Sequence, residues 1–141
     1  MRTKRMEIVI DTWLMERASS DVKAVQLLKV IIEKCHKIIL DYDAEILSEY
    51  SRHMKGYAKK FFAKCSMEGK IDYKAQANLH EEFRKKAIDP DDIKFLCVCI
   101  NTVHKIFIKG DRKLLKHKNQ LKKRFKVHIL DVVEALHLLS A

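Results

Sequence analysis

The chain has 141 residues, with 29 Lys and Arg against 19 Asp and Glu, so its formal net charge is +10. A chain of this length forms one domain and buries roughly 68–70% of its unfolded surface, so we treat residues 1–141 as a single domain. No apolar run approaches the roughly 18 residues that cross a membrane, which argues against a membrane protein. The positive charge favours a polyanionic partner.

The four cysteines argue against a structural metal site. They form no CxxC pair, and two of them lie two residues apart on a predicted helix, where their side chains point in different directions. Free thiols and the lack of a secretion signal predict a cytoplasmic protein in a reducing compartment. These cysteines are Cys35, Cys65, Cys97 and Cys99.

The first half of the chain predicts two strands and their helices. Residues 7–10 form a short apolar strand, typical of a buried parallel one, and Asp11 follows it directly. A helical turn begins near Trp13, and Asp21 can cap a second helix. Residues 37–40 form the next strand, ended by Asp41, and a long helix covers about residues 44–64.

The second half continues the alternation. A shorter helix is expected over residues 73–86, and the Asp89-Pro90 pair starts another one, since Asp is a favoured N-cap and Pro a favoured first residue. Residues 103–108 are β-branched and aromatic enough for a strand, which Gly110 ends. Broken helix follows around residues 114–121, then a strand at 127–130 and a helix at 131–139.

This alternation predicts an α/β fold: a doubly wound, mostly parallel sheet of short strands with helices on both faces. Ligands bind such sheets at the carboxyl ends of the strands. Asp11 and Asp111 leave two such ends, and Asp92 begins the helix that leads to the second of those strands. Glu49 lies at the border of the apolar face of the long helix.

Carboxylates gathered at one edge repel one another unless a cation lies between them. Oxygen ligands of this kind suit Mg²⁺ or Mn²⁺, which activate water for phosphodiester cleavage. Each acid also has a structural alternative. Asp11 and Asp111 could cap the helices that follow them, Asp89 could be a helix cap, and Glu49 could be an ordinary solvated residue.

Four segments together resemble the PIN-domain family, and most closely its prokaryotic members described as toxin components. They are IVIDT (residues 8–12), ILSEY (46–50), DPDDIKFL (89–96) and GDRKLL (110–115). The resemblance spans nearly the whole chain and implies a PIN-like fold and a divalent-metal-dependent ribonuclease. By that resemblance the catalytic and metal-binding acids are Asp11, Glu49, Asp92 and Asp111.

Two residues depart from the family pattern. Trp13 stands where the family commonly has Asn or Ser, and Lys109 stands where it commonly has Thr or Ser. The indole could narrow the cleft or stack on a base. The ammonium of Lys109 could partly replace a metal or hold a phosphate.

A basic segment follows the predicted site. Residues 109–126 contain nine Lys or Arg and a single acid, Asp111, which suits a phosphate backbone; the alternative is a solvated surface. The candidate nucleic-acid contacts are Lys109, Arg112, Lys113, Lys116 and Lys118.

The leading hypothesis is therefore a metal-dependent endoribonuclease of PIN type that acts on RNA with Mg²⁺ or Mn²⁺. A toxin role would require a partner with an acidic, antitoxin-like segment, and the resemblance makes a homodimer plausible. One alternative is a PIN-like module that binds RNA or a protein without cleavage. A second is a phosphoacceptor domain of receiver type, disfavoured because a single acid follows the first strand.

Overall fold

The computed structural model describes residues 4–141. Its centre is one sheet of five parallel strands in the order β3-β2-β1-β4-β5. The strands are β1 (Glu7–Ile10), β2 (Lys37–Asp41), β3 (Ile71–Lys74), β4 (Ile106–Ile108) and β5 (His128–Leu130).

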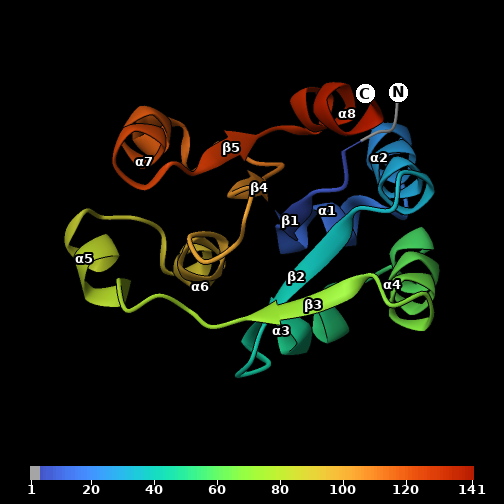
Figure 1. The fold of residues 1–141 in the computed structure, drawn as a ribbon, viewed down its shortest axis with the longest axis horizontal. Helices are drawn as coiled ribbons and strands as arrows, with labels where there is room; N and C mark the ends of the chain where they lie inside the picture. Colours follow the sequence, from blue (N-terminus) through green and yellow to red (C-terminus); the bar gives the residue numbers. More distant parts are fainter. Residues whose placement is uncertain (1–3) are drawn as a thin grey trace.

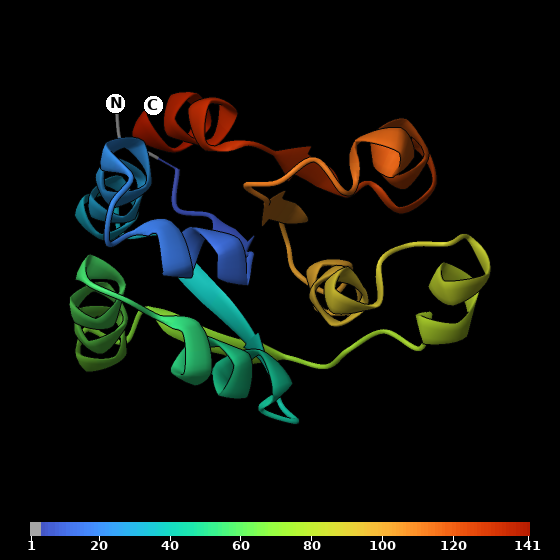
Figure 2. The same cartoon turned by 180° about the vertical axis from the view of Figure 1, so that it is seen from behind.

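Helices fill the connections between the strands. Figure 1 shows α2, α4 and α8 on one side of the sheet and α5, α6 and α7 on the other, and Figure 2 shows the same arrangement from behind. The doubly wound α/β architecture predicted from the sequence is thereby confirmed. The helices are α1 (Thr12–Arg17), α2 (Val22–Glu33), α3 (Glu45–His53), α4 (Tyr57–Met67), α5 (His80–Lys85), α6 (Pro90–Cys99), the 3₁₀ turn η1 (Leu115–His117), α7 (Lys118–Phe125) and α8 (Val132–Ser140).

The strand order places the predicted site at a topological switch point. From β1 the chain winds outward through β2 to β3, then crosses back to place β4 on the other side of β1. Ile10 and Ile108, the last residues of β1 and β4, are direct partners. The backbone N–H of Asp11 donates to the Ile108 carbonyl at 2.9 Å. The segments that leave these two strands therefore start side by side, where doubly wound sheets bind ligands.

The buried core supports this edge from both faces. Ile8, Val9 and Ile10 are fully buried, as an apolar strand covered by helices on both sides must be. On one face α6 packs against β1, β2 and β4. The rings of Phe95 on α6 and Phe107 on β4 stack with centroids 5.5 Å apart. The start of α6 is thus fixed against the strands.

The predicted long helix over residues 44–64 is wrong, because the chain forms two helices, α3 and α4, with a break between them. Gly56 lies in the break with φ of 56°, a conformation that favours glycine. A Cβ at this position would lie 2.8 Å from the Cα of Ser19. The close approach of the Ser19 turn therefore requires a bend here, which helical periodicity does not reveal.

The helix expected over residues 73–86 is also wrong at its start. Residues 71–74 form β3, the edge strand that pairs with β2, and helix is confined to α5. The strand predicted over 103–108 is shorter, because Lys105 adopts φ of 54° and only residues 106–108 join the sheet. The broken helix after residue 114 is confirmed as η1 and α7. None of the helices within residues 4–141 is long and apolar enough to cross a membrane.

Candidate functional site

A cleft of about 370 Å³ opens at the carboxyl edge of β1 and β4. All four predicted acids line it, although they come from four separate parts of the chain. Three cationic side chains, Arg52, Lys109 and Lys113, share the lining with them. We call this cavity the acidic cleft; its acids of interest are Asp11, Glu49, Asp92 and Asp111.

Local structure explains how two of the acids point into the cleft. Asp11 occupies the N-cap position of α1, but its side chain makes no capping hydrogen bond and is directed elsewhere. Asp92 lies in the first turn of α6. That helix begins at Pro90 and is capped by Asp89, whose carboxylate accepts from the N–H of Asp91 at 2.9 Å. Capping is therefore the role of Asp89, and it leaves Asp11 and Asp92 available for the cleft.

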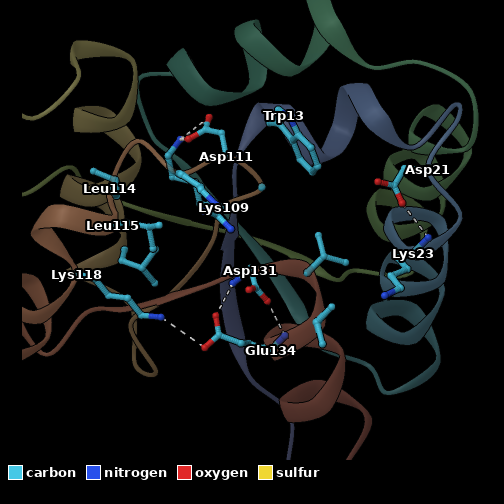
Figure 3. A pocket seen from close by; sticks show the side chains of 15 residues that line it. Trp13, Asp21, Lys23, Lys109, Asp111, Leu114, Leu115, Lys118, Asp131 and Glu134 are labelled. Carbon is cyan, nitrogen blue, oxygen red and sulfur yellow. Dashed lines mark hydrogen bonds and ion pairs between the residues drawn. The ribbon is translucent and has the colours of Figure 1, made fainter.

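Asp111 lies in the turn after β4 and caps no helix. Its Oδ1 accepts from the backbone N–H of Lys113 at 2.9 Å, which holds the turn. Its carboxylate faces back toward the strand end, where both of its oxygens lie 3.1 Å from the ammonium of Lys109. Figure 3 shows these two side chains together beside Trp13.

Lys109 is the centre of the three aspartates. Its ammonium nitrogen lies 2.6 Å from Asp92 Oδ1, 3.3 Å from Asp11 Oδ2 and 3.1 Å from Asp111 Oδ1. The side chain is 2% exposed. An ammonium carries three N–H donors and no acceptor, so each donor faces one carboxylate. Lys109, predicted as a nucleic-acid contact, is thus buried and directed toward the three aspartates.

The electrostatics of the cluster reflect burial and the neighbouring charges. Burial raises the pKa of Asp11 to about 6, with Lys109 opposing the shift and the other two aspartates adding to it. Burial likewise raises the pKa of Asp92, again opposed by Lys109. For Lys109, burial lowers the pKa, but Asp11 and Asp92 outweigh it and hold the pKa above its ordinary value. The lysine is therefore charged at neutral pH.

The three aspartates are the kind of hard oxygen ligands that Mg²⁺ prefers, but the site as built does not fit that ion. Mg²⁺ requires oxygens at about 2.0–2.1 Å in octahedral geometry. The three carboxylates instead surround the Lys109 nitrogen at 2.6 to 3.3 Å. Within residues 4–141 no group of three or more His, Cys, Asp and Glu side chains is arranged to hold a metal ion. The cluster has the dimensions of an ammonium site.

Glu49 has a separate cation. Its Oε1 lies 2.6 Å from the ammonium of Lys94 on α6, and its Oε2 accepts from the hydroxyl of Thr12. The next residue, Tyr50, is fully buried and donates its hydroxyl to the carbonyl of Ile10. That bond fixes α3 against the end of β1, so Glu49 lines the cleft from a rigid position. It forms an ion pair there and makes no contact with Lys109.

Trp13 closes one side of the cleft. Its indole packs so tightly on Gly110 that a Cβ at position 110 would lie 1.7 Å from ring carbon Cε3. The guanidinium of Arg17 lies 5.5 Å from the ring centroid. The indole thus lines the acidic cleft. It also borders a neighbouring cavity of about 460 Å³, whose lining includes Leu114, Leu115, Lys118, Asp131 and Glu134 (Figure 3).

Sequence reasoning missed two members of the site, Thr12 and Lys94. Both adjoin predicted acids: Thr12 follows Asp11, and Lys94 lies two residues after Asp92. Neither position carries a signal by itself, because the partner of both is Glu49, which lies on another helix. Only the packing of α3 against α1 and α6 brings them together.

The remaining predicted RNA contacts differ in solvent exposure and in ion pairing. Arg112, Lys113 and Lys116 are exposed, whereas Lys118 is half-buried. Lys113 pairs with Asp89 at 3.3 Å, and Lys118 pairs with Glu134 at 3.5 Å. Among residues 4–141, no ion pair engages the remaining exposed cations of this segment, which are Arg112, Lys116, Lys122, Lys123 and Lys126.

The chain therefore combines a parallel α/β sheet with acids at its switch point and a buried lysine among three of them. No protein-family model, no curated protein and no solved structure matches it. The likeness to PIN domains rests on the four sequence motifs.

Proposed function

We propose that this chain is a PIN-like domain that binds single-stranded RNA along the border of the acidic cleft. The observation that carries the proposal is the set of exposed cations after Asp111 that no acid of residues 4–141 neutralises. Arg52 adds a further exposed cation at the cleft itself. A protein surface that pairs most of its acids but leaves these cations free attracts a phosphate backbone.

The charge balance of the cleft is compatible with RNA binding at its border. Lys109 and Lys94 neutralise part of the carboxylate charge inside the cleft, so the acids repel a phosphate less than four free carboxylates would. The exposed cations after Asp111 would also attract an acidic, antitoxin-like protein segment, which would then compete with RNA.

The test compares two charge-matched double variants. Lys116→Gln/Lys122→Gln removes two exposed, unpaired cations of the segment after Asp111, whereas Lys59→Gln/Lys60→Gln removes two exposed lysines of α4. Binding of a fluorescent single-stranded RNA is measured by anisotropy over a salt series in metal-free buffer. We expect the first pair alone to weaken binding and to lower the salt slope by about 0.7 for each lost phosphate contact. Equal effects of the two pairs would contradict the proposed site.

The second candidate function is the metal-dependent endoribonuclease of PIN type, acting as a toxin component. The convergence of Asp11, Asp92 and Asp111 favours it, as does the Oδ2 atom of Asp92, which is buried with no hydrogen-bond partner in the described part of the chain. It requires the ammonium of Lys109 to leave the centre of these aspartates. Its test is cleavage of single-stranded RNA with Mg²⁺ or Mn²⁺. Activity that Asp11→Asn abolishes without loss of folding would support it, and cleavage that persists in this variant would reject it.

A further inference from the structure

The cation at the centre of the three aspartates belongs to the chain itself. Lys109 is the residue directly after β4, and its backbone N–H donates to the Leu130 carbonyl at 2.9 Å. Its position is therefore fixed by the sheet and does not depend on a flexible loop. Gly110, the next residue, is covered by the indole of Trp13, which restricts movement of the backbone on the other side.

The ammonium and a metal ion cannot share this place. Each of its three donors faces one carboxylate, so no carboxylate in the cluster lacks a contact with it. The lysine side chain is 2% exposed, and the ring of Phe107 lies beneath its nitrogen at 6.0 Å from the centroid. A divalent ion bound by all three aspartates would require Lys109 to leave a closed position in which its charge is fully compensated.

We propose that the ammonium of Lys109 is the resident cation of this site and takes the place of a divalent metal. Glu49 shows the same arrangement on a smaller scale, because the ammonium of Lys94 neutralises it. The wild-type chain accordingly folds and binds its partner without Mg²⁺ or Mn²⁺. Replacing Lys109 by an uncharged residue turns the three aspartates into a site that requires an external cation.

This inference does not depend on RNA binding, which is measured in metal-free buffer. Mn²⁺ and Mg²⁺ are titrated by calorimetry into the wild type, Lys109→Met and Lys109→Met/Asp92→Asn. The control is Lys113→Met, which removes an exposed lysine at the rim of the same cleft. Thermal unfolding of each protein is followed with MnCl₂ and with KCl at equal ionic strength, since a ligand that binds only the folded state raises the melting temperature.

We expect no specific Mn²⁺ binding and no Mn²⁺-dependent rise in melting temperature for the wild type and Lys113→Met. Lys109→Met should melt lower than the wild type, bind Mn²⁺ at least tenfold more tightly, and recover melting temperature with MnCl₂ but not with KCl. Asp92→Asn in the same chain should remove that gain. Specific Mn²⁺ binding by the wild type would overturn the proposal, and so would a folded Lys109→Met that gains none.

Should Lys109→Met fail to fold, the wild type still decides the question in two ways. Its Mn²⁺ titration tests the proposal without the variant, and its lysine ammonium groups can be observed by ¹⁵N-detected NMR. We expect one slowly exchanging NH₃⁺ resonance that persists at neutral pH, is unchanged by Mg²⁺ and is absent from Lys109→Arg. A Lys109 resonance that shifts or exchanges rapidly on addition of Mg²⁺ would overturn the proposal.

Discussion

The indole of Trp13 packs directly against the backbone of Gly110, so any side chain at position 110 would clash with the ring. An ideal Cβ there would lie 1.7 Å from Cε3 and 2.1 Å from Cζ3 of the indole. This contact joins the first turn after β1 to the first turn after β4. It thereby fixes the two segments that carry Asp11 and Asp111.

The first prediction is that Gly110→Ala is destabilising through this contact alone. Forcing one extra carbon into a packed site costs about 1–3 kcal/mol, because the indole must move away from Gly110 to admit it. Chemical denaturation followed by circular dichroism measures the loss. In a Trp13→Ala background, Gly110→Ala should cost less than about 0.5 kcal/mol, as expected at a site with no steric conflict. An equal cost in both backgrounds would place the conflict elsewhere.

The second prediction concerns the pair of Glu49 and Lys94, whose side chains are 16% and 18% exposed. A double-mutant cycle with Glu49→Gln and Lys94→Met should give a coupling free energy of about 1 kcal/mol or more, above the usual range for surface pairs. The control is the pair of Glu81 and Lys85, which are 77% and 76% exposed and should couple by about 0.3–0.5 kcal/mol. Similar coupling in the two cycles would show that Glu49 is effectively solvated.

The third prediction is a pH dependence from His36, which is fully buried. Its Nδ1 accepts from the N–H of Met6 at 3.0 Å, and its Nε2 lies 3.0 Å from the carbonyl of Leu139. Burial lowers the pKa of His36 below its usual value near 6.5, and the charges of His104 and Lys34 lower it further. Protonation would place a second donor against the Met6 N–H and a charge in the core.

Because the unfolded chain binds this proton more readily, the contribution of His36 to stability is complete above about pH 6.5 and falls as the pH decreases below it. Asp11, whose pKa is raised to about 6, has the opposite dependence, because the folded chain binds its proton more readily. Denaturant unfolding between pH 7 and pH 5 measures this contribution of His36 as the difference in stability between the wild type and His36→Gln. His36→Gln should remove the loss of stability that protonation of His36 causes. His137→Gln, at an exposed position of α8, should keep the wild-type pH dependence, and the same pH dependence in the wild type and His36→Gln would contradict the role of His36.

The fourth prediction concerns the thiols, all of which are free. Cys65, Cys97 and Cys99 are buried, and burial raises the pKa of Cys65 and Cys97 to about 11. Since the thiolate is the reactive form, we expect only the half-buried Cys35 to react with Ellman's reagent at pH 8 in the folded protein. Cys35→Ser should remove this phase. Rapid reaction of a second thiol would mean that the core opens locally.

Sequence alone could predict the parts of this protein that local chemistry decides. An apolar run such as Ile8–Ile10 must be buried on both faces, an Asp-Pro pair starts a helix, and Gly110 ends a strand. Parallel strands then bring their carboxyl ends to one edge, so the convergence of Asp11, Asp92 and Asp111 followed from where each acid stands in its element. The cleft contains them together with Glu49.

Tertiary structure decided what those acids contact. A lysine that follows a strand has the same local sequence signature whether its ammonium reaches water or a neighbouring carboxylate. The pairing of β1 with β4 and the docking of α6 set the direction of Lys109 and enclose its charge among three aspartates. The break at Gly56 and the edge strand β3 arise in the same way, from neighbours distant in sequence. Charge neutralisation inside the cleft is therefore a property of the packed sheet and could not be predicted from any one segment.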